Sequence, residues 1–237
     1  MAVTGKIRKL LPLRPCGAVI VAAGNASRMG GIDKVMALLG GEPVIARTVR
    51  TFQECDCISE IVIVTREDLV APVSSLCGGY SKVQAVITGG STRQESVKRG
   101  LSLLSGRMQL AAVHDAARPL VTPAVIDRTV RAAHSHHAAA PAIAVKDTIK
   151  EVAGGFVRST PDRAYLRAVQ TPQVFDIDIL KVALKKAEDD GIAVTDDCSA
   201  VEYLGMSVKI VEGDERNIKI TTPMDLKLGE MLLEERT

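Results

Sequence analysis

The sequence predicts an α/β protein built on a doubly wound, mostly parallel sheet. Short apolar runs of strand length alternate along the chain with amphipathic stretches of helical spacing. The first run, GAVIVAAG at residues 17–24, contains no polar residue, which is typical of a strand buried on both faces of a parallel sheet. Three of the runs end in loops of small or charged residues, and ligands of such sheets bind beyond the carboxyl ends of the strands.

The first part of the chain follows this alternation closely. The predicted strands are apolar runs at residues 17–24, 59–65, 82–90, 109–119 and 138–145. The predicted helices have apolar residues at helical spacing, at residues 43–53, 67–76, 91–104 and 122–137. Pro43 and Pro123 suit first helical turns, and Thr92 with Glu95 has the pattern of a capping box.

The alternation breaks between residues 146 and 173. Short β-like runs flank the dipeptide Gly154-Gly155, which favours a hairpin turn. We interpret this segment, about residues 146–173, as a β-arm that projects from the domain. A projecting hairpin exposes an edge and apolar surface, so we expect a homodimer that exchanges arms. The alternative is a hairpin folded against its own sheet.

Strands and helices resume after the arm. A helix is predicted from about Asp176, a strand at residues 207–213, and a further helix at the C-terminus. The segment NIKIT, residues 217–221, is predicted to be a strand with Lys219 and Thr221 on one face. Because an interior strand rarely carries a lysine without an ion pair or a ligand, this lysine is a candidate site residue.

Length, charge and cysteine content limit the class of protein. We expect one domain over residues 15–237, arm included, after an N-terminal extension at residues 1–14 that lacks the features of a signal peptide; a targeting segment is the alternative for this extension. The net charge of +2 argues against a general nucleic-acid binder, and no apolar run approaches the roughly 20 residues of a membrane span. The five cysteines form no CxxC pair, so we expect neither disulfides nor zinc, and a cytoplasmic location.

The loop AAGNASRMGGIDK, residues 22–34, is a candidate phosphate site. It matches neither the dinucleotide-binding pattern nor the P-loop pattern. Its small residues still allow successive backbone N–H groups to approach anionic oxygens. Arg28 can bind phosphate through two N–H groups and Lys34 can act as a point charge, so the loop has the cations to wrap a triphosphate. The alternative is an ordinary strand-to-helix turn whose cations face water.

Charged residues also follow the predicted strand at residues 109–119, in the motif HDAARP. Asp115 is suited to hold sugar hydroxyls or to help place Mg²⁺, which prefers one or two carboxylates together with substrate phosphates. Arg118 would then clamp a phosphate or the substrate. The alternative is a local ion pair that caps a turn. We expect His114 to be a hydrogen-bonded core histidine rather than a catalytic base.

The motif TDDCSAVE contains paired carboxylates at a predicted helix start. Thr195 is the predicted N-cap, and the helix dipole favours Asp196 and Asp197 in the first turn, so both acids have a sufficient structural explanation. The Thr195 hydroxyl remains available to a ligand. Cys198 has acidic neighbours and no basic one, so we interpret it as structural.

Seven motifs occur in the order that is found in one enzyme family: AAGNASRM, GGSTRQESV, HDAARP, DTIK, QTPQVF, TDDCSAVE and EGDERNIKITTPMDL. From about Cys16 to the C-terminal helix, the sequence resembles the 2-C-methyl-D-erythritol 4-phosphate cytidylyltransferases of the non-mevalonate isoprenoid pathway. The resemblance implies a Rossmann-like nucleotidyltransferase fold and a homodimer joined through the β-arm. It also implies that CTP and methylerythritol 4-phosphate react, with Mg²⁺, to give the CDP-alcohol and pyrophosphate.

The implied chemistry is an in-line attack of the substrate phosphate on the α-phosphorus of CTP. That nucleophile is already ionised at neutral pH, so no general base is needed and catalysis rests on positioning and charge stabilisation. The resemblance implies no certain protein ligand of the metal. We expect Mg²⁺ to bind through the CTP phosphates, close to Asp115.

The resemblance implies three sets of site residues. Those implied to be catalytic are Arg28, Lys34, Arg163 and Lys219. Those implied to bind the nucleotide are Ala22, Ala23, Gly24, Gly90, Ser91, Arg93, Ser96 and Asp115. Those implied to bind the substrate are Asp115, Arg118, Thr148, Arg163, Thr171, Thr195, Lys219 and Thr221. Arg163 matches an arm arginine that enters the neighbouring subunit's site in the family, which would make the dimer necessary for function.

The chain departs from the family in the sequence IDKVM, where the family often has Pro-Lys-Gln. A negative charge on Asp33 would weaken the field of Lys34. A ribitol 5-phosphate cytidylyltransferase, which shares the fold and most motifs, is the alternative activity, and HDAARP together with DTIK favours methylerythritol 4-phosphate. A non-catalytic nucleotide sensor is the other alternative. The charged residues expected at the reacting phosphorus argue against it, because a sensor does not need them.

Overall fold

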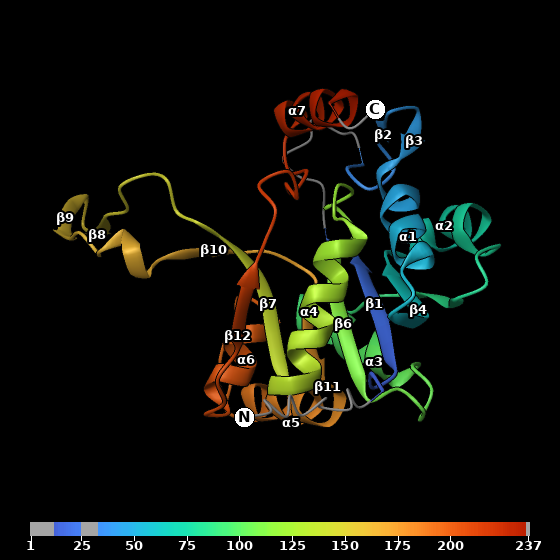
Figure 1. The fold of residues 1–237 in the computed structure, drawn as a ribbon, viewed down its shortest axis with the longest axis horizontal. Helices are drawn as coiled ribbons and strands as arrows, with labels where there is room; N and C mark the ends of the chain where they lie inside the picture. The colour runs from blue at the N-terminus through green and yellow to red at the C-terminus, as the bar shows by residue number, and fades with distance from the viewer. Residues whose placement is uncertain (1–11, 25–32, 236–237) are drawn as a thin grey trace, which may run out of the picture.

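A computed structural model describes residues 12–24 and 33–235. Its centre is an eight-stranded sheet with the strand order β10-β7-β11-β6-β1-β4-β5, and β12 also pairs with β7 (Figure 1). The strands of this sheet are β1 (Cys16–Ala22), β4 (Ile58–Thr65), β5 (Val83–Thr88), β6 (Leu110–Asp115), β7 (Ala138–Ala144), β10 (Arg167–Val169), β11 (Gln173–Asp176) and β12 (Lys209–Glu212). The predicted α/β fold is confirmed.

The helices lie between these strands in the chain, except the last one, which follows β12. They are α1 (Val44–Glu54), α2 (Val70–Cys77), α3 (Arg93–Ser102), α4 (Pro123–His136), α5 (Ile177–Asp189), α6 (Asp197–Tyr203) and α7 (Pro223–Glu234). A short 3₁₀ turn, η1 (Glu67–Leu69), leads into α2, and another, η2 (Arg163–Tyr165), lies after the arm hairpin. Thr92, Thr122 and Thr222 cap α3, α4 and α7 with their side chains, which is why these helix starts follow from the sequence.

The sheet is parallel where the apolar runs predict it. β6, β1, β4 and β5 are parallel neighbours. β11, which was not predicted, lies antiparallel between β6 and β7. The strand expected at residues 217–221 is wrong, because this segment joins no strand and is held instead by a hydrogen bond from the Ile220 N–H to the Ala117 carbonyl at 2.8 Å.

β1 is buried on both faces, which explains its lack of polar residues. Ala18 and Ile20 face the core formed with α1, α2 and α4, whereas Val19 faces the core formed with α3, α5 and α6. All three side chains are fully buried, and burying one the size of Ile20 stabilises the fold by roughly 2 kcal/mol. Helices therefore cover both faces of the sheet, as a doubly wound fold requires.

A smaller apolar cluster holds α7 over the end of the sheet. It joins α7 to the hairpin of β2 (Leu38–Leu39) and β3 (Glu42–Pro43), which lies beside α7 at the top of Figure 1. Leu39, Val44, Leu120 and Ile220 are its buried members. The cluster fixes the segment that precedes α7 near the carboxyl ends of the central strands.

The predicted β-arm is present at the left of Figure 1. In the described part of the chain, β8 (Glu151–Ala153) and β9 (Phe156–Ser159) pair only with each other, and they project away from the sheet. Gly154 and Gly155 form the turn with φ angles of +59° and +83°, a conformation that favours glycine. Phe156 is 80% exposed, so the alternative of a hairpin folded against its own sheet is wrong.

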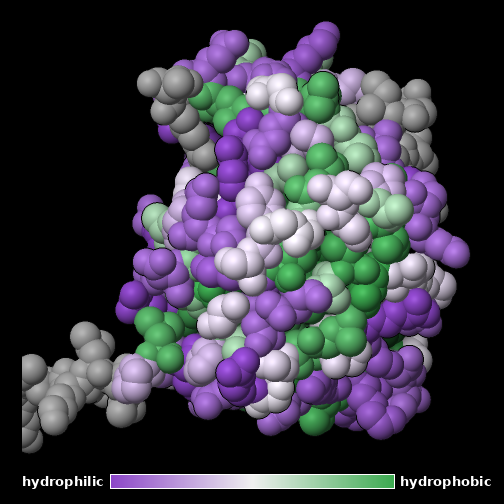
Figure 2. All heavy atoms as spheres, turned by 90° about the vertical axis from the view of Figure 1, so that its right-hand side faces the viewer, coloured by the Kyte–Doolittle hydropathy of each residue, from purple (hydrophilic) through white to green (hydrophobic). Residues whose placement is uncertain are grey.

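The surface of the body differs from that of the arm. Figure 2 shows hydrophilic and hydrophobic side chains interspersed over the face on the α2 side, which is ordinary for a globular protein. On the arm, Phe156, Val157 and Tyr165 are all mostly exposed. Within residues 12–24 and 33–235, the helices are too short or too polar to cross a membrane.

Candidate active site

A cleft of about 460 Å³ opens at the carboxyl ends of β1, β4, β5 and β6. This is the sheet edge at which the sequence predicted a site. The predicted site residues that line it are Ala22, Ala23, Gly24, Lys34, Gly90, Ser91, Arg93, Ser96, Asp115 and Lys219. Arg66 and Glu67 also line it and were not predicted. Arg28, predicted to be catalytic, lies outside the described residues.

The loops after β1 and β5 lie against each other because residue 89 is glycine. A Cβ atom at Gly89 would lie 2.5 Å from Ala23 Cβ and 2.7 Å from Ser96 Oγ, too close without a shift of the neighbours. The Gly90 N–H donates to Ser96 Oγ at 3.1 Å. Backbone groups of the two loops therefore face one cleft, as close approach to a nucleotide requires.

Thr92 caps α3 as predicted, whereas the Glu95 carboxylate, the other half of the predicted capping box, accepts from Ser91. The Glu95 N–H donates to Thr92 Oγ1 at 3.1 Å. The Glu95 carboxylate accepts from the Ser91 N–H at 2.5 Å and from the Ser91 hydroxyl at 2.8 Å, and these hydrogen bonds lower its pKa. The loop is thereby held in place on a helix N-terminus, which favours a bound anion.

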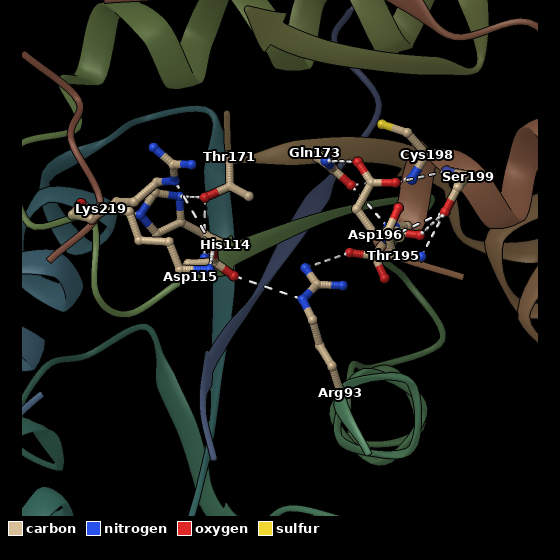
Figure 3. Close-up of polar contacts among 12 residues, drawn as sticks. Arg93, His114, Asp115, Thr171, Gln173, Thr195, Asp196, Cys198, Ser199 and Lys219 are labelled. Carbon is tan, nitrogen blue, oxygen red and sulfur yellow. Dashed lines mark hydrogen bonds and ion pairs between the residues drawn. The ribbon is translucent and has the colours of Figure 1, made fainter. Parts of the chain in front are cut away.

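Asp115, the last residue of β6, is surrounded by cations (Figure 3). Lys219 Nζ lies 2.7 Å from its Oδ2 atom, Arg93 Nε lies 3.7 Å from its Oδ1 atom, and Arg118 Nε lies 3.9 Å from Oδ2. Burial by itself would raise the pKa of Asp115, but these cations together lower it to about 2. Asp115 is therefore an anion at neutral pH that gathers three positive side chains.

His114 and Thr171 support Asp115 through its backbone. The Asp115 N–H donates to Thr171 Oγ1 at 3.1 Å, and this oxygen lies 3.0 Å from His114 Nδ1. His114 Nε2 lies 3.3 Å from the Arg118 carbonyl, which can only accept, so Nε2 carries the proton and Thr171 donates to Nδ1. Burial lowers the pKa of His114 to about 3. The expected core histidine is confirmed, and the Thr171 hydroxyl, predicted to bind substrate, is engaged inside the protein.

Lys219 is held by its neighbours rather than by a strand. Besides the Ile220 bond to Ala117, Arg118 Nη1 donates to the Asn217 carbonyl at 2.7 Å. These contacts tie the segment before α7 to the loop after β6. Lys219 is therefore brought to the end of β6 by loop contacts that sequence periodicity does not reveal.

Arg93 also reaches Asp197 at the start of α6. Arg93 Nη2 lies 2.8 Å from Asp197 Oδ2, and this carboxylate is almost fully buried. Burial raises the pKa of Asp197, against the opposing effect of the arginine. Sequence reasoning missed this ion pair, because the helix dipole already accounts for two adjacent acids in a first turn.

The predicted N-cap of α6 is wrong by one residue. Asp196 is the cap: its Oδ1 atom accepts from the Ser199 N–H at 2.9 Å, and Ser199 Oγ accepts from the Asp196 N–H at 3.2 Å. Gln173, on β11, secures the same turn by donating from Nε2 to Asp196 Oδ2 at 2.7 Å and by accepting from the Asp197 N–H at 3.0 Å. Thr195 is exposed, and its role toward a ligand stays a prediction.

Lys34 reaches back to the end of β1. A Cβ atom at Gly24 would lie 3.4 Å from Lys34 Nζ. Asp33, which precedes Lys34 in the chain, accepts a hydrogen bond from the Val35 N–H on its Oδ1 atom at 2.9 Å. Lys34 is therefore carried on a hydrogen-bonded turn at the cleft wall.

Some predicted substrate-binding residues do not line the cleft of their own chain. Thr148 and Arg163 belong to the arm and are exposed, and Arg163 Nη1 donates to the Lys146 carbonyl at 3.0 Å. Thr221 Oγ1 donates to Asp225 Oδ2 at 2.7 Å and so supports the start of α7. Thr148, Arg163 and Thr221 are therefore absent from the lining of this cleft.

The cleft suits a metal ion that arrives with a phosphate ligand. Among the described residues, no group of three or more His, Cys, Asp or Glu side chains is placed to hold a metal ion. Asp115 and Glu67 are carboxylates on the cleft wall. Mg²⁺ needs only one or two carboxylates when substrate phosphates complete its coordination, so this donor set fits such an ion.

Comparisons with known proteins point to one family. The family model described as 2-C-methyl-D-erythritol 4-phosphate cytidylyltransferase matches residues 16–235. The protein of this name from Symbiobacterium thermophilum is 46% identical over 93% of this chain and 94% of its own length. The one from Caldanaerobacter subterraneus is 43% identical over 91% of this chain and 97% of its own length.

Solved structures of similar proteins share the fold. The crystal structure of 4-diphosphocytidyl-2C-methyl-D-erythritol synthase from Anaerococcus prevotii has a TM-score of 0.84 at 31% identity, covering 93% of this chain and 96% of that one. The 2-C-methyl-D-erythritol 4-phosphate cytidylyltransferase from Thermus thermophilus has a TM-score of 0.76 at 31% identity, covering 93% and 99%. With a family match over nearly its whole length, this chain belongs to the 2-C-methyl-D-erythritol 4-phosphate cytidylyltransferase family.

Proposed function

We propose that this chain joins CTP to 2-C-methyl-D-erythritol 4-phosphate by in-line attack. A bond forms between a substrate phosphate oxygen and the α-phosphorus of CTP, and the bond to the β-phosphate oxygen breaks, releasing pyrophosphate. Family membership gives the reaction, and the cleft supports the route. One observation carries the proposal: Lys34, Arg93 and Lys219 line the same cleft, and small residues form part of its wall.

The nucleotide is proposed to bind along the two glycine-containing loops. Residues 22–24 and 89–91 present backbone to the cleft, and the close fit at Gly89 keeps the loops together. Ser91 and Ser96 offer hydroxyl groups beside this backbone. This wall would hold the base and the triphosphate, as the resemblance implies.

The reaction needs cations more than a base. A phosphate monoester has a second pKa of about 6, so the nucleophile is already ionised at neutral pH. His114, beside the cleft carboxylate, is buried and hydrogen-bonded at both ring nitrogens, and so is not free to take a proton from substrate. We assign Lys34, with Arg28, to the charge that develops at the α-phosphorus, and Lys219 to the substrate phosphate.

Asp115 is proposed to organise these cations and to bind substrate hydroxyls. Its ionised carboxylate lies close to Lys219, Arg93 and Arg118. Mg²⁺, when bound with CTP, would supply neutralisation of the triphosphate charge. Thr195 and Thr221 are retained as proposed substrate contacts on the strength of the resemblance alone.

A homodimer joined through the arms is part of the proposal. The arm exposes Phe156 and Tyr165, which are 80% and 86% exposed, and such apolar surface favours a partner. Arg163 and Thr148 lie outside the cleft of their own chain, so we propose that they enter the cleft of the second chain. We also propose that residues 15–237 act as one domain, and that the five free thiols reflect a reducing, cytoplasmic location.

Pyrophosphate release tests the proposed substrates directly. The protein is assayed with CTP, UTP, ATP or GTP, each with methylerythritol 4-phosphate or ribitol 5-phosphate. We expect the fastest release with CTP and methylerythritol 4-phosphate. Faster release with ribitol 5-phosphate, or with another nucleotide, would contradict the proposal.

A further inference from the structure

The acid beside Lys34 has a partner that the predicted site did not include. Arg66 follows β4 and lines the cleft together with Lys34. Its Nη1 atom donates to Asp33 Oδ2 at 2.5 Å. Its Nε and Nη2 atoms donate to the two oxygens of Asp68 at 3.0 Å and 2.9 Å. One guanidinium therefore binds two acids that lie on different segments.

These contacts fix the direction of the Asp33 carboxylate. One oxygen accepts the Val35 N–H, and the other accepts from Arg66. The side chains of Asp33 and Arg66 are only 20% and 26% exposed, so water screens their pairing less than it screens a surface ion pair. The turn that carries Lys34 is thus anchored to the end of β4.

An unpaired carboxylate at this place would oppose the lysine. Asp33 and Lys34 are neighbours in the chain, and Lys34 Nζ lies against the end of β1 in the cleft. A negative charge on the same turn lowers the positive potential that the lysine presents to an anion. Arg66 supplies a positive charge to the same carboxylate.

We propose that Arg66 is a positioning residue that anchors Asp33 and offsets part of its negative charge, so that Asp33 weakens the field of Lys34 at a triphosphate less than an unpaired carboxylate would. This rests on the role proposed for Lys34 above. A direct contact of Arg66 with the triphosphate is the competing explanation for its place in the cleft. Three of the five N–H groups of the guanidinium are already engaged by the two acids, which favours the positioning role.

A double-mutant cycle separates the two roles. Arg66→Gln leaves Asp33 charged beside Lys34, and we expect kcat with CTP and methylerythritol 4-phosphate to fall about tenfold. Asp33→Asn removes the charge while its side-chain oxygen still accepts the Val35 N–H. The double variant should therefore recover to within about threefold of the unmodified protein. A double variant as slow as Arg66→Gln, or slower, would overturn the proposal.

Two controls make the cycle decisive. Arg131→Gln removes another Arg–Asp pair, with Asp127 at 2.7 Å on the exposed side of α4, and should leave kcat unchanged. Thermal unfolding of each variant checks that the loss in Arg66→Gln is not a loss of folded protein.

The Lys34→Ala background distinguishes this proposal from the proposed function. In the Lys34→Ala protein, adding Arg66→Gln should lower the single-turnover rate only slightly, because Lys34, whose field Asp33 would weaken, is absent. An equal cost of Arg66→Gln with and without Lys34 would overturn the positioning role. Unchanged turnover of Lys34→Ala by itself would instead overturn the role proposed for Lys34.

Discussion

Lys219 Nζ lies 2.7 Å from Asp115 Oδ2 and so joins the segment before α7 to the end of β6. Arg93 approaches the same carboxylate from α3, and Arg118 approaches it from the loop after the strand. One anion thereby gathers cations from three parts of the chain at a single cleft. A site organised in this way stabilises phosphate charge by positions that are set before substrate binds.

Asp115→Asn tests this organising role. Without the anion, Lys219, Arg93 and Arg118 repel one another and lose their common partner. We expect kcat/KM for methylerythritol 4-phosphate to fall at least about tenfold, equivalent to about 1.4 kcal/mol. Steady-state pyrophosphate release measures it. Asp127→Asn, in an exposed ion pair on α4, is the control, and a variant at Asp115 that matches this control would contradict the account.

Lys34→Ala tests the role of the cation at the end of β1. Removing a charge aimed at the developing phosphoryl charge should cost about 3 kcal/mol of transition-state stabilisation, similar to the loss of an oxyanion donor. Single-turnover cytidylyl transfer measures this cost. Lys185→Ala removes an exposed lysine of α5 and is expected to have no effect. A rate for Lys34→Ala close to that of Lys185→Ala would be incompatible with the proposed role.

The buried histidine predicts how stability depends on pH. Folding lowers the pKa of His114 from 6.5 to about 3, so between these values the unfolded chain binds more protons than the folded one. The free energy of unfolding therefore falls as the pH drops below about 6.5, by up to about 1.4 kcal/mol per pH unit from this residue. Urea unfolding at pH 7, 6 and 5 measures the slope.

His114→Gln is the matched variant for that slope, since glutamine does not titrate. We expect its free energy of unfolding to be lower than that of the unmodified protein at pH 7, because a buried hydrogen-bonding partner of Thr171 and Arg118 is changed. We also expect its dependence on pH to be shallower. Parallel curves for the two proteins would show that His114 does not titrate on unfolding as described.

Mixed dimers test the exchange of arm residues. If Arg163 serves the cleft of the second chain, Arg163→Ala should raise the KM for methylerythritol 4-phosphate more than the KM for CTP. A dimer that combines one Arg163→Ala chain with one Lys34→Ala chain keeps one complete site, so activity should recover to a fraction of the unmodified value. Activity of verified mixed dimers no higher than that of either parent would argue that each cleft uses its own chain alone.

The parts of the fold that follow from local chemistry were predictable. β1 is an unbroken apolar run because both its faces are buried, and Thr92 caps α3 because its side chain accepts an N–H within the same turn. Asp115 was predicted because a charge directly after a buried strand marks the sheet edge where ligands bind. The glycine pair of the arm also specified its turn locally.

The parts that depend on distant partners were not predictable. β11 is a four-residue strand that exists because it fills the place between β6 and β7. Asp196 rather than Thr195 caps α6. Both residue types are good N-caps, so local preference does not decide between them. The hydrogen bond from Gln173 on β11 to the Asp196 carboxylate favours Asp196. Residues 217–221 alternate like a strand, but Ile220 is buried against α7 instead of pairing in the sheet.

A crystal structure of the protein with CTP and Mg²⁺ tests the central claim most directly, through the distances from cationic side chains to the phosphate oxygens. The account predicts the triphosphate in the cleft between residues 22–24 and 89–91, with Lys34 Nζ within about 4 Å of a phosphate oxygen, the range of an ion pair. It also predicts that Lys219 still contacts Asp115 at the substrate side of the α-phosphorus. A triphosphate bound outside this cleft, or bound there with Lys34 and Lys219 turned to bulk water, would contradict it.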